Sequence, residues 1–489
     1  MKENSNKNLN PVLNSLSDDY IYVDNEIQDA IVKVKLWKYF KKYGIAEKRT
    51  GFQMKQIVFT LIIWVFLGKE SIRSFMGNLI SNFFLGGKDV LYDFMKREDI
   101  NWRQVTLSVS KEIYLAENLS TQTKVAFVVD DTIKNRRGKK VEGVSSHFDH
   151  TTGRVVKGQQ VLQLGLAWPD GYIPVDNQIY IGSKNIQGLV KDFKDGRSAV
   201  AKDYEVALNK TKHEQLEEMV KRAMRNGINP EYLLADSWFG CKKNIKLAFD
   251  LGLTGILRMK RGNLKFRMND NFYTLKMLYQ FIKRRLEKSK DSNWKSTTLK
   301  VELNLSEDED KPEWKTILLV FSSPKNPKKG EWAAFASTDI EMKATKVLEV
   351  YSLRWGIEVF FKEAKQNLGF LVEQTGNYAS HYASINLTSI RYLLLFSAMK
   401  TRGADYLGEI RNSISGKLEF ISLASLMWEL FKAVIYGALE QIAAINAGLL
   451  KTIKETIQEN IESFLEKALQ LDCEYLKNER KAEKLRLIV

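Results

Sequence analysis

Apolar residues recur every three to four positions from about Ile27 to Glu117, a spacing that predicts a helical region. No proline interrupts this stretch. The pattern then changes to short apolar runs bounded by polar residues, which predict strands, beginning with the Val-rich run Lys124–Thr132. Two further runs, GQQVLQLGLAW and YIPVDNQIYIG, are separated by Pro-Asp-Gly, so we expect them to form an antiparallel pair.

A second helical period covers Asp203–Asn226, and the run NPEYLLADSWFG behind it predicts a short buried strand ending at an acidic residue. The sequence after Leu253 alternates like a series of strands. From Lys343 the period is helical again, and no proline occurs between there and Val489. The order predicted is therefore helical, α/β, β-rich and helical.

These changes of pattern predict an α/β fold class with a β-rich block and with helical regions at both ends. A helical N-terminal domain covers residues 1–118, an α/β region covers 119–252 and the β-rich block covers 253–342. A helical segment covers 343–400, and a helical C-terminal region covers 401–489.

The charge balance limits the classes of partner that the protein is expected to bind. The 489 residues include 75 Lys and Arg against 59 Asp and Glu, a net charge of +16, which favours a polyanionic partner. An anionic membrane is the weaker choice, because the longest apolar run, Ile57–Leu67, is too short to span a bilayer and the N-terminus has no apolar signal core. Two isolated cysteines and four histidines argue against zinc. We therefore expect a cytoplasmic protein that binds nucleic acid.

Two basic segments carry much of this charge. Five basic residues occur within seven positions just after the first strand: Lys134, Arg136, Arg137, Lys139 and Lys140. Between Arg258 and Lys300, thirteen basic residues stand against three acidic ones, and this stretch includes Lys283, Arg284 and Arg285. Such segments are often only solvated loops, but contact with the phosphate backbone of DNA is the better explanation for the second.

Two acidic positions end buried strands. Asp130 and Asp131 close the Val-rich strand, and Asp236 closes the later one. Each could simply cap a turn. However, carboxylates at strand ends with no His or Cys nearby are also typical of hard oxygen ligands for Mg²⁺ or Mn²⁺. The pair His147 and His150 lacks a third ligand and is not expected to bind metal.

A third acid lies in the helical run YSLRWGIEVFFKEAKQNLGF. On a helical wheel its polar residues share an arc of about 80° between two apolar flanks. They are Tyr351, Arg354, Glu358, Lys362 and Lys365. A plain amphipathic helix would also give this pattern. One acid among an Arg, two Lys and a Tyr nevertheless suits a metal ligand beside groups that hold phosphate.

The spacing Tyr351-x2-Arg354-x3-Glu358-x6-Lys365 resembles the YREK signature of the DDE transposases of bacterial insertion sequences. The segments VVDDT and ADSWFG resemble the first and second acid segments of that family. The resemblance covers about residues 120–375 and implies an RNase H-like core with a β-strand domain inserted between the second and third acids. By this resemblance residues 119–252 and 343–400 are the two parts of the core, and 253–342 are the inserted domain. The resemblance does not cover the N-terminal helical domain, which we expect to bind DNA.

The resemblance implies that Asp131, Asp236 and Glu358 are the catalytic acids and metal ligands. Asp131 is preferred because the acid of the family usually precedes Thr or Ser, and Asp130 remains the alternative. It further implies two Mg²⁺ ions, with Mn²⁺ as a substitute, and DNA contacts by Tyr351, Arg354, Lys362 and Lys365. In members that form hairpins a Trp of the inserted domain stacks on a flipped base, and Trp332 is the candidate here.

The function expected is that of a transposase that binds terminal inverted repeats, cleaves the element ends by hydrolysis and joins the 3′-OH ends to target DNA. Its partners would be double-stranded DNA and a second copy of the chain, near the bacterial nucleoid, without a membrane. No ATP-binding motif is present. The alternatives are an RNase H-like nuclease without strand transfer and a catalytically inert DNA-binding regulator derived from a transposase.

Overall fold

The computed structural model describes residues 23–44, 51–68, 71–73, 86–138, 140–149, 152–182, 186, 191–288, 293–308, 310–328, 330–373, 375–416, 418–419, 434–435, 439, 448 and 451–457. Lys139, His150 and most of the predicted C-terminal helical region therefore lie outside the described residues.

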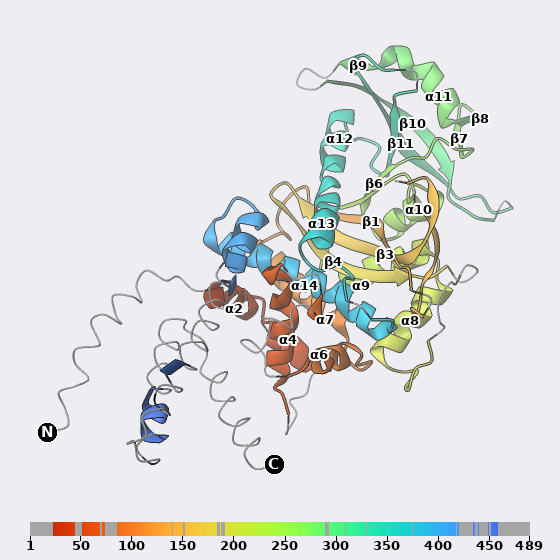
Figure 1. Cartoon of the computed structure of the whole chain (residues 1–489). Helices are drawn as coiled ribbons and strands as arrows, with labels where there is room; N and C mark the ends of the chain where they lie inside the picture. The colour runs from red at the N-terminus through yellow and green to blue at the C-terminus, as the bar shows by residue number, and fades with distance from the viewer. Residues whose placement is uncertain are drawn as a thin grey trace.

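A mixed sheet of twelve strands runs through the part of the chain that the structure describes (Figure 1). Its first half has the spatial order β4 (Gly171–Tyr180), β3 (Arg154–Trp168), β1 (Ala126–Asn135), β5 (Tyr232–Ala235) and β6 (Thr254–Arg258). The short strand β2 (Ser145–Asp149) pairs antiparallel with the first residues of β3. β3 is antiparallel to β1 and β4, whereas β1, β5 and β6 are parallel. This is strand order 3-2-1-4-5 with the second strand reversed, the order of an RNase H-like fold. The predicted fold class is confirmed.

The β-rich insertion continues the same sheet. The chain leaves β6, forms the outer strands and returns through β12 (Ala333–Ser337), which pairs antiparallel with β6. The outer strands are β7 (Lys265–Met268), β8 (Asn271–Thr274), β9 (Glu287–Lys288), β10 (Trp294–Asn304) and β11 (Trp314–Pro324). Helix α11 (Leu275–Ile282) and the short η4 (Lys283–Arg285) interrupt them. The insertion is therefore hydrogen-bonded to the core strands along one edge.

Helices gather beyond the opposite end of the sheet (Figure 1). The N-terminal helices are α2 (Val23–Lys33), α3 (Leu36–Lys42), α4 (Met54–Ile63) with η1 (Trp64–Leu67), α6 (Lys88–Met95) and α7 (Trp102–Ala116). The late helix α14 (Tyr378–Arg402) packs against α2, α7 and β4, and nearly all of its side chains are buried. The predicted helical character of residues 27–117 is thus confirmed for the part that the structure describes.

Two segments that were each predicted to be one continuous helix are in fact divided into two helices. The period over 203–226 belongs to α8 (Ala199–Asn209) and α9 (Lys212–Arg225), because Thr211 and Glu214 form a capping box that starts a new helix. The period from Lys343 belongs to α12 (Ala344–Ser352) and α13 (Trp355–Gln366), joined by a tight turn. Between β5 and β6 lies α10 (Lys242–Asp250).

A buried cluster of charges connects the helical region to the sheet. Arg103 of α7 lies with its Nε 3.1 Å from Asp176 of β4 and also pairs with Asp203 of α8. Arg222 of α9 pairs with the other oxygen of Asp176, and the Tyr378 hydroxyl donates to Asp203 at 2.6 Å. Burial opposes the charge on Arg103, but Asp203 and Asp176 outweigh it and raise its pKa. The network satisfies four buried groups that would each be costly alone.

None of the helices in the residues described is both long and apolar enough to cross a lipid bilayer.

Replacing one member of this cluster should destabilise the folded state. We expect Asp203→Ala to lower the free energy of unfolding by about 3–5 kcal/mol, because the buried Arg103 is left with Asp176 alone, which Arg222 shares. Lys96→Ala is the matched control, since Lys96 pairs with Asp93 on the surface and should cost less than about 1 kcal/mol. Urea unfolding of both variants measures the difference. Equal costs would show that the cluster does not stabilise the fold.

Candidate active site

The register of the parallel strands brings two acids together. Val129 of β1 pairs with Ala235 of β5, so the next residues, Asp130 and Asp236, lie side by side. Asp236 follows the end of β5, but the prediction that Asp130 and Asp131 end their strand is wrong, because β1 stays paired with β3 as far as Asn135. The backbone N–H groups of Trp238 and Phe239 donate to one oxygen of Asp236, at 3.0 and 3.3 Å. These bonds hold the Asp236 carboxylate in the turn after β5.

Glu358 is connected to Asp130 through Arg354. The Arg354 guanidinium stands at the start of α13, with Nη1 3.0 Å from Oδ2 of Asp130, and it also pairs with Glu358 one turn along the helix. Tyr351, at the end of α12, packs its ring against Phe335 of β12. Tyr351, Arg354 and Glu358 therefore remain neighbours, although a turn separates α12 from α13.

Asp131 points away from this group, because successive side chains of a strand face opposite sides of the sheet. Its two oxygens are 2.7 Å from Nζ of Lys212, at the start of α9, and 2.8 Å from Nε2 of Gln160 on β3. Of the two neighbouring acids, the structure thus brings Asp130 together with Asp236 and Glu358. It places Asp131 against Lys212 instead.

The environment of Asp130 disfavours its charge. Burial and the nearby negative charge of Asp236 raise the pKa of Asp130 to about 7, and Arg354 offsets only part of this effect. Burial also raises the pKa of Tyr351 to about 12, so its hydroxyl keeps its proton at neutral pH. Burial lowers the pKa of Lys365, which faces Asp149 and Asp130.

A groove of about 660 Å³ opens over these acids. Asp130, Asp131 and Asp236 line it, together with Lys212 and Lys365. Its aromatic side chains include Trp238, Phe148 and Tyr180. The groove thus combines acids, two lysines and flat apolar surfaces, a set of groups that can hold a charged, base-containing strand.

The donor type of the site fits a hard divalent cation. Asp130 and Asp236 offer carboxylate oxygens that repel each other, and a cation between them would relieve that repulsion. Glu358 is engaged by Arg354. Within the part of the chain that the structure describes, no three acidic, His or Cys side chains lie close enough together to enclose a metal ion. The third ligand would therefore have to part from Arg354.

The other predicted contact residues are dispersed. Lys362 is exposed on α13, and Arg137 is exposed after β1. Arg136 instead turns inward, where its Nε donates to Gln159 at 2.9 Å, so it does not present its charge to solvent as a DNA contact would. Trp332 stacks on Tyr279, with ring centroids 4.3 Å apart, and Arg261 covers the ring at 4.8 Å. A base could therefore stack on Trp332 only by displacing one of these neighbours.

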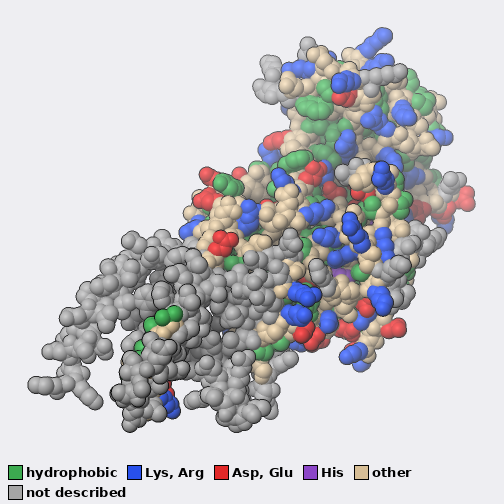
Figure 2. Space-filling view, viewed as in Figure 1, with side chains coloured by type: hydrophobic (Ala, Val, Ile, Leu, Met, Phe, Trp, Pro, Cys, Tyr) green, Lys and Arg blue, Asp and Glu red, His purple; other side chains and the backbone are tan. Residues whose placement is uncertain are grey.

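The predicted basic residues of the insertion are exposed. Lys283, Arg284 and Arg285 form η4, none of them buried, at the end of the molecule farthest from the N-terminal helices. In Figure 2 Lys and Arg side chains gather with hydrophobic ones over this upper lobe. Exposed Met277 and Phe281 of α11 belong to the same lobe.

The sequence interpretation missed Lys212 and Trp238, which both line the groove. The Trp238 ring stacks on His213, with centroids 4.9 Å apart, and the Lys212 ammonium lies 4.0 Å from the centre of that ring. One signal was available, because the pattern Thr211-x-x-Glu214 predicts that a helix begins at Lys212. Its nearness to Asp131 depends on the tertiary structure.

Two family models match the chain, in overlapping segments. The DDE superfamily endonuclease model matches residues 84–276, and the transposase DDE domain model matches residues 195–389. The first segment contains Asp130, Asp131 and Asp236, and the second contains Asp236 and Glu358. Each model matches less than half of the chain, so these segments are similar to DDE endonuclease and transposase domains.

Among solved structures, the chain is similar to the Drosophila P element transposase strand transfer complex, at 10% identity. The match covers 84% of this chain and 93% of that one, with a TM-score of 0.21. At this TM-score the fold assignment rests on the strand order of the sheet alone. No curated protein matches the chain.

The environment of Asp130 predicts a pH-dependent stability. In the folded state Asp130 keeps its proton up to about pH 7, whereas in the unfolded state an Asp loses it near pH 4. The free energy of unfolding therefore falls as the pH rises from about 4 to 7. Between pH 5 and pH 8 the wild-type protein should lose about 2–3 kcal/mol more unfolding free energy than Asp130→Asn.

Urea unfolding in EDTA at both pH values measures this difference. Asp170→Asn, in the exposed turn between β3 and β4, is the matched control and should follow the wild type. An Asp130→Asn protein with the same pH dependence as the wild type would contradict the raised pKa.

Proposed function

We propose that the protein is a DDE transposase of the YREK group, encoded by a bacterial insertion sequence. It would bind terminal inverted repeats, cleave the element ends by metal-dependent hydrolysis and join the 3′-OH ends to target DNA. The observation that supports this most is that Asp130 lies beside Asp236 and pairs with Arg354, which also pairs with Glu358, although the three acids are more than 100 positions apart in the sequence.

We further propose that Asp130, rather than Asp131, is the first acid. Asp130 faces Asp236 and the residue that pairs with Glu358, whereas both oxygens of Asp131 already accept bonds from Lys212 and Gln160. Asp130 also accepts bonds at both oxygens, from the Asp131 N–H at 2.8 Å and from Arg354. The choice therefore rests on the neighbours of each acid: Asp130 lies beside the charge of Asp236, whereas Asp131 is paired with Lys212.

In this proposal Asp130, Asp236 and Glu358 hold divalent cations, two Mg²⁺ ions or Mn²⁺ in their place. When bound, such ions activate the attacking oxygen and stabilise the leaving oxygen in an in-line displacement. Arg354 would exchange its carboxylate partners for a DNA phosphate, to which a guanidinium can donate two parallel hydrogen bonds. Lys365 and the protonated Tyr351 hydroxyl would donate to the same strand, and Lys362 would contact DNA at the exposed side of α13.

The partners proposed are the double-stranded ends of the element and the target DNA. Two ends must be held together for joining, so a homodimer on DNA is part of the proposal. The exposed arginines and lysine of η4 would contact the phosphate backbone at a distance from the groove.

Single substitutions of the acids test the assignment. Asp130→Ala, Asp236→Ala and Glu358→Ala should each abolish Mg²⁺-dependent strand cleavage even at saturating DNA, because each removes a ligand. Asp131→Ala should retain cleavage at saturating DNA. Denaturing gels of end-labelled DNA carrying the inverted repeats provide the measurement, with EDTA as the metal-free control. Activity in Asp130→Ala together with its loss in Asp131→Ala would reverse the choice of acid.

The products of the same reaction test the class of enzyme. A transposase yields element ends covalently joined to a target plasmid. Cleaved ends that never join would identify a metal-dependent nuclease, and inertness with Mg²⁺ and cognate ends would identify a regulator.

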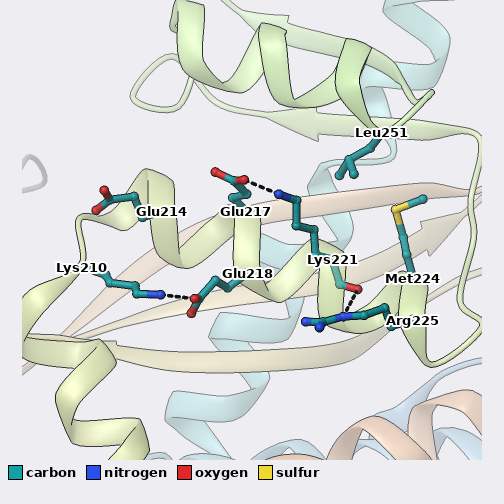
Figure 3. A pocket seen from close by; sticks show the side chains of 8 residues that line it. All are labelled: Lys210, Glu214, Glu217, Glu218, Lys221, Met224, Arg225 and Leu251. Carbon is teal, nitrogen blue, oxygen red and sulfur yellow. Dashed lines mark hydrogen bonds and ion pairs between the residues drawn. The ribbon is translucent and has the colours of Figure 1, made fainter.

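The salt dependence of binding tests the basic lobe. Neutralising Lys283, Arg284 and Arg285 together to Gln should reduce the slope of log K against log salt by about one to three units, since each phosphate contact contributes about 0.9. Lys210, just before α9, and Lys221 and Arg225 on α9 line another pocket and give a control with the same charge change. There Lys210 pairs with Glu218 and Lys221 with Glu217 (Figure 3). An equal slope change in both triple variants would refute a specific role for η4.

A further inference from the structure

The groove carries an ion pair that the proposed chemistry does not use. Asp131 and Lys212 lie 2.7 Å apart, and Gln160 donates to the second oxygen of Asp131 at 2.8 Å. Both side chains of the pair line the groove together with Asp130 and Asp236. Asp131 and Asp130 are neighbours on β1, so their side chains leave the strand in opposite directions.

Lys212 is held in a defined position. It is the first residue of α9, directly after the Thr211 cap, and only 9% of its side chain is exposed. Its ammonium lies 4.0 Å from the centre of the Trp238 ring and 5.5 Å from that of Tyr180. A lysine on the surface loses considerable rotamer freedom when it binds a ligand. Lys212 has already lost it, so it is preorganised for binding.

The ammonium still has donors to offer. It carries three N–H groups, and Asp131 accepts one of them. The acids that line the groove, Asp130, Asp131, Asp149 and Asp236, would repel a polynucleotide when ionised. Two lysines of the lining, Lys365 and Lys212, oppose this repulsion. A phosphate that approaches the acids would therefore be attracted by these two cations.

We propose that Lys212 binds a backbone phosphate of the DNA strand in the groove and that Asp131 is a positioning residue that holds Lys212 in place. This inference rests on the proposed function, because it assumes that DNA enters the groove. It assigns separate roles to the two neighbouring acids of β1. Asp130 faces the reacting site, and Asp131 orients a phosphate-binding lysine on the other side.

The alternative is a purely structural ion pair between β1 and α9, and the two accounts predict different binding data. The full chain is titrated with a fluorescently labelled DNA duplex in EDTA at several salt concentrations, so that no cleavage occurs. A phosphate contact by Lys212 requires that Lys212→Gln reduce the slope of log K against log salt by about 0.9. Lys212→Arg should retain the slope. Lys210→Gln is the matched control and should retain it too, because Lys210 pairs with Glu218 on the outer face of α9 (Figure 3).

Asp131→Asn tests the positioning role. Removing a negative charge beside DNA would by itself strengthen binding, whereas loss of positioning weakens it. We expect several-fold weaker binding in Asp131→Asn and no further weakening when Asp131→Asn is added to Lys212→Gln. Stronger binding of Asp131→Asn, or additive losses in the double variant, would refute the positioning role.

Lys212→Met provides a neutral side chain of similar length that can still pack on Trp238, so it replaces Lys212→Gln if that variant fails to fold. A folded neutral variant with the wild-type slope would overturn the proposal. If wild-type protein binds DNA with the Lys212-dependent slope but never cleaves with Mg²⁺, the phosphate site is supported and the proposed function fails. If it cleaves but the slope is independent of Lys212, only this inference fails.

Discussion

The position of β1 between β3 and β5 constrains everything at the site. This strand is hydrogen-bonded along both edges, antiparallel on one side and parallel on the other, so it cannot slip by one residue without breaking two registers. A fixed register fixes which side chain faces which side. Asp130 must face α13 and Asp131 must face α9, and the chemistry proposed for each follows from that assignment.

The helical region depends on a different constraint, the buried charges around Arg103. A charged group without a partner in the interior would cost several kcal/mol, so α7, α8 and α9 can pack on β4 only in the arrangement that pairs Arg103, Asp176, Asp203 and Arg222. Apolar contacts alone would tolerate small shifts between these helices. The ion pairs do not, and α9 in turn sets the position of Lys212.

The sequence predicted much of the fold because the segments with strong periodicity are local features. The Val-rich strand, the hairpin of β3 and β4 and the amphipathic YREK run could all be recognised without neighbours. The ends of helices were harder to predict, because the breaks at Thr211 and at Leu353 fall inside a continuous apolar period. Helix α11 was missed within a segment dominated by alternation, although its buried Leu275, Leu278 and Ile282 have helical spacing.

The site was only partly predictable for a related reason. The residue types and spacing around Glu358 indicated a polar face, and the predicted strand ends indicated Asp236 and the Asp130–Asp131 pair, although β1 continues past that pair to Asn135. A preference for Thr after the acid selected Asp131, but orientation depends on the register with β3 and β5, which the sequence does not encode locally. The inward turn of Arg136 and the covered faces of Trp332 likewise depend on partners far along the chain, Gln159 and Tyr279.

The unbroken hydrogen bonding between β6 and β12 has a mechanical consequence. Two lobes joined by a flexible linker can rotate about it, whereas strands of one sheet can only bend and twist together. The basic η4 at one end of this sheet and the acids near its middle are therefore held at a nearly constant separation. If DNA contacts both η4 and the acids, the length of the sheet between them sets the number of nucleotides between the phosphate bound by η4 and the bond that is cut.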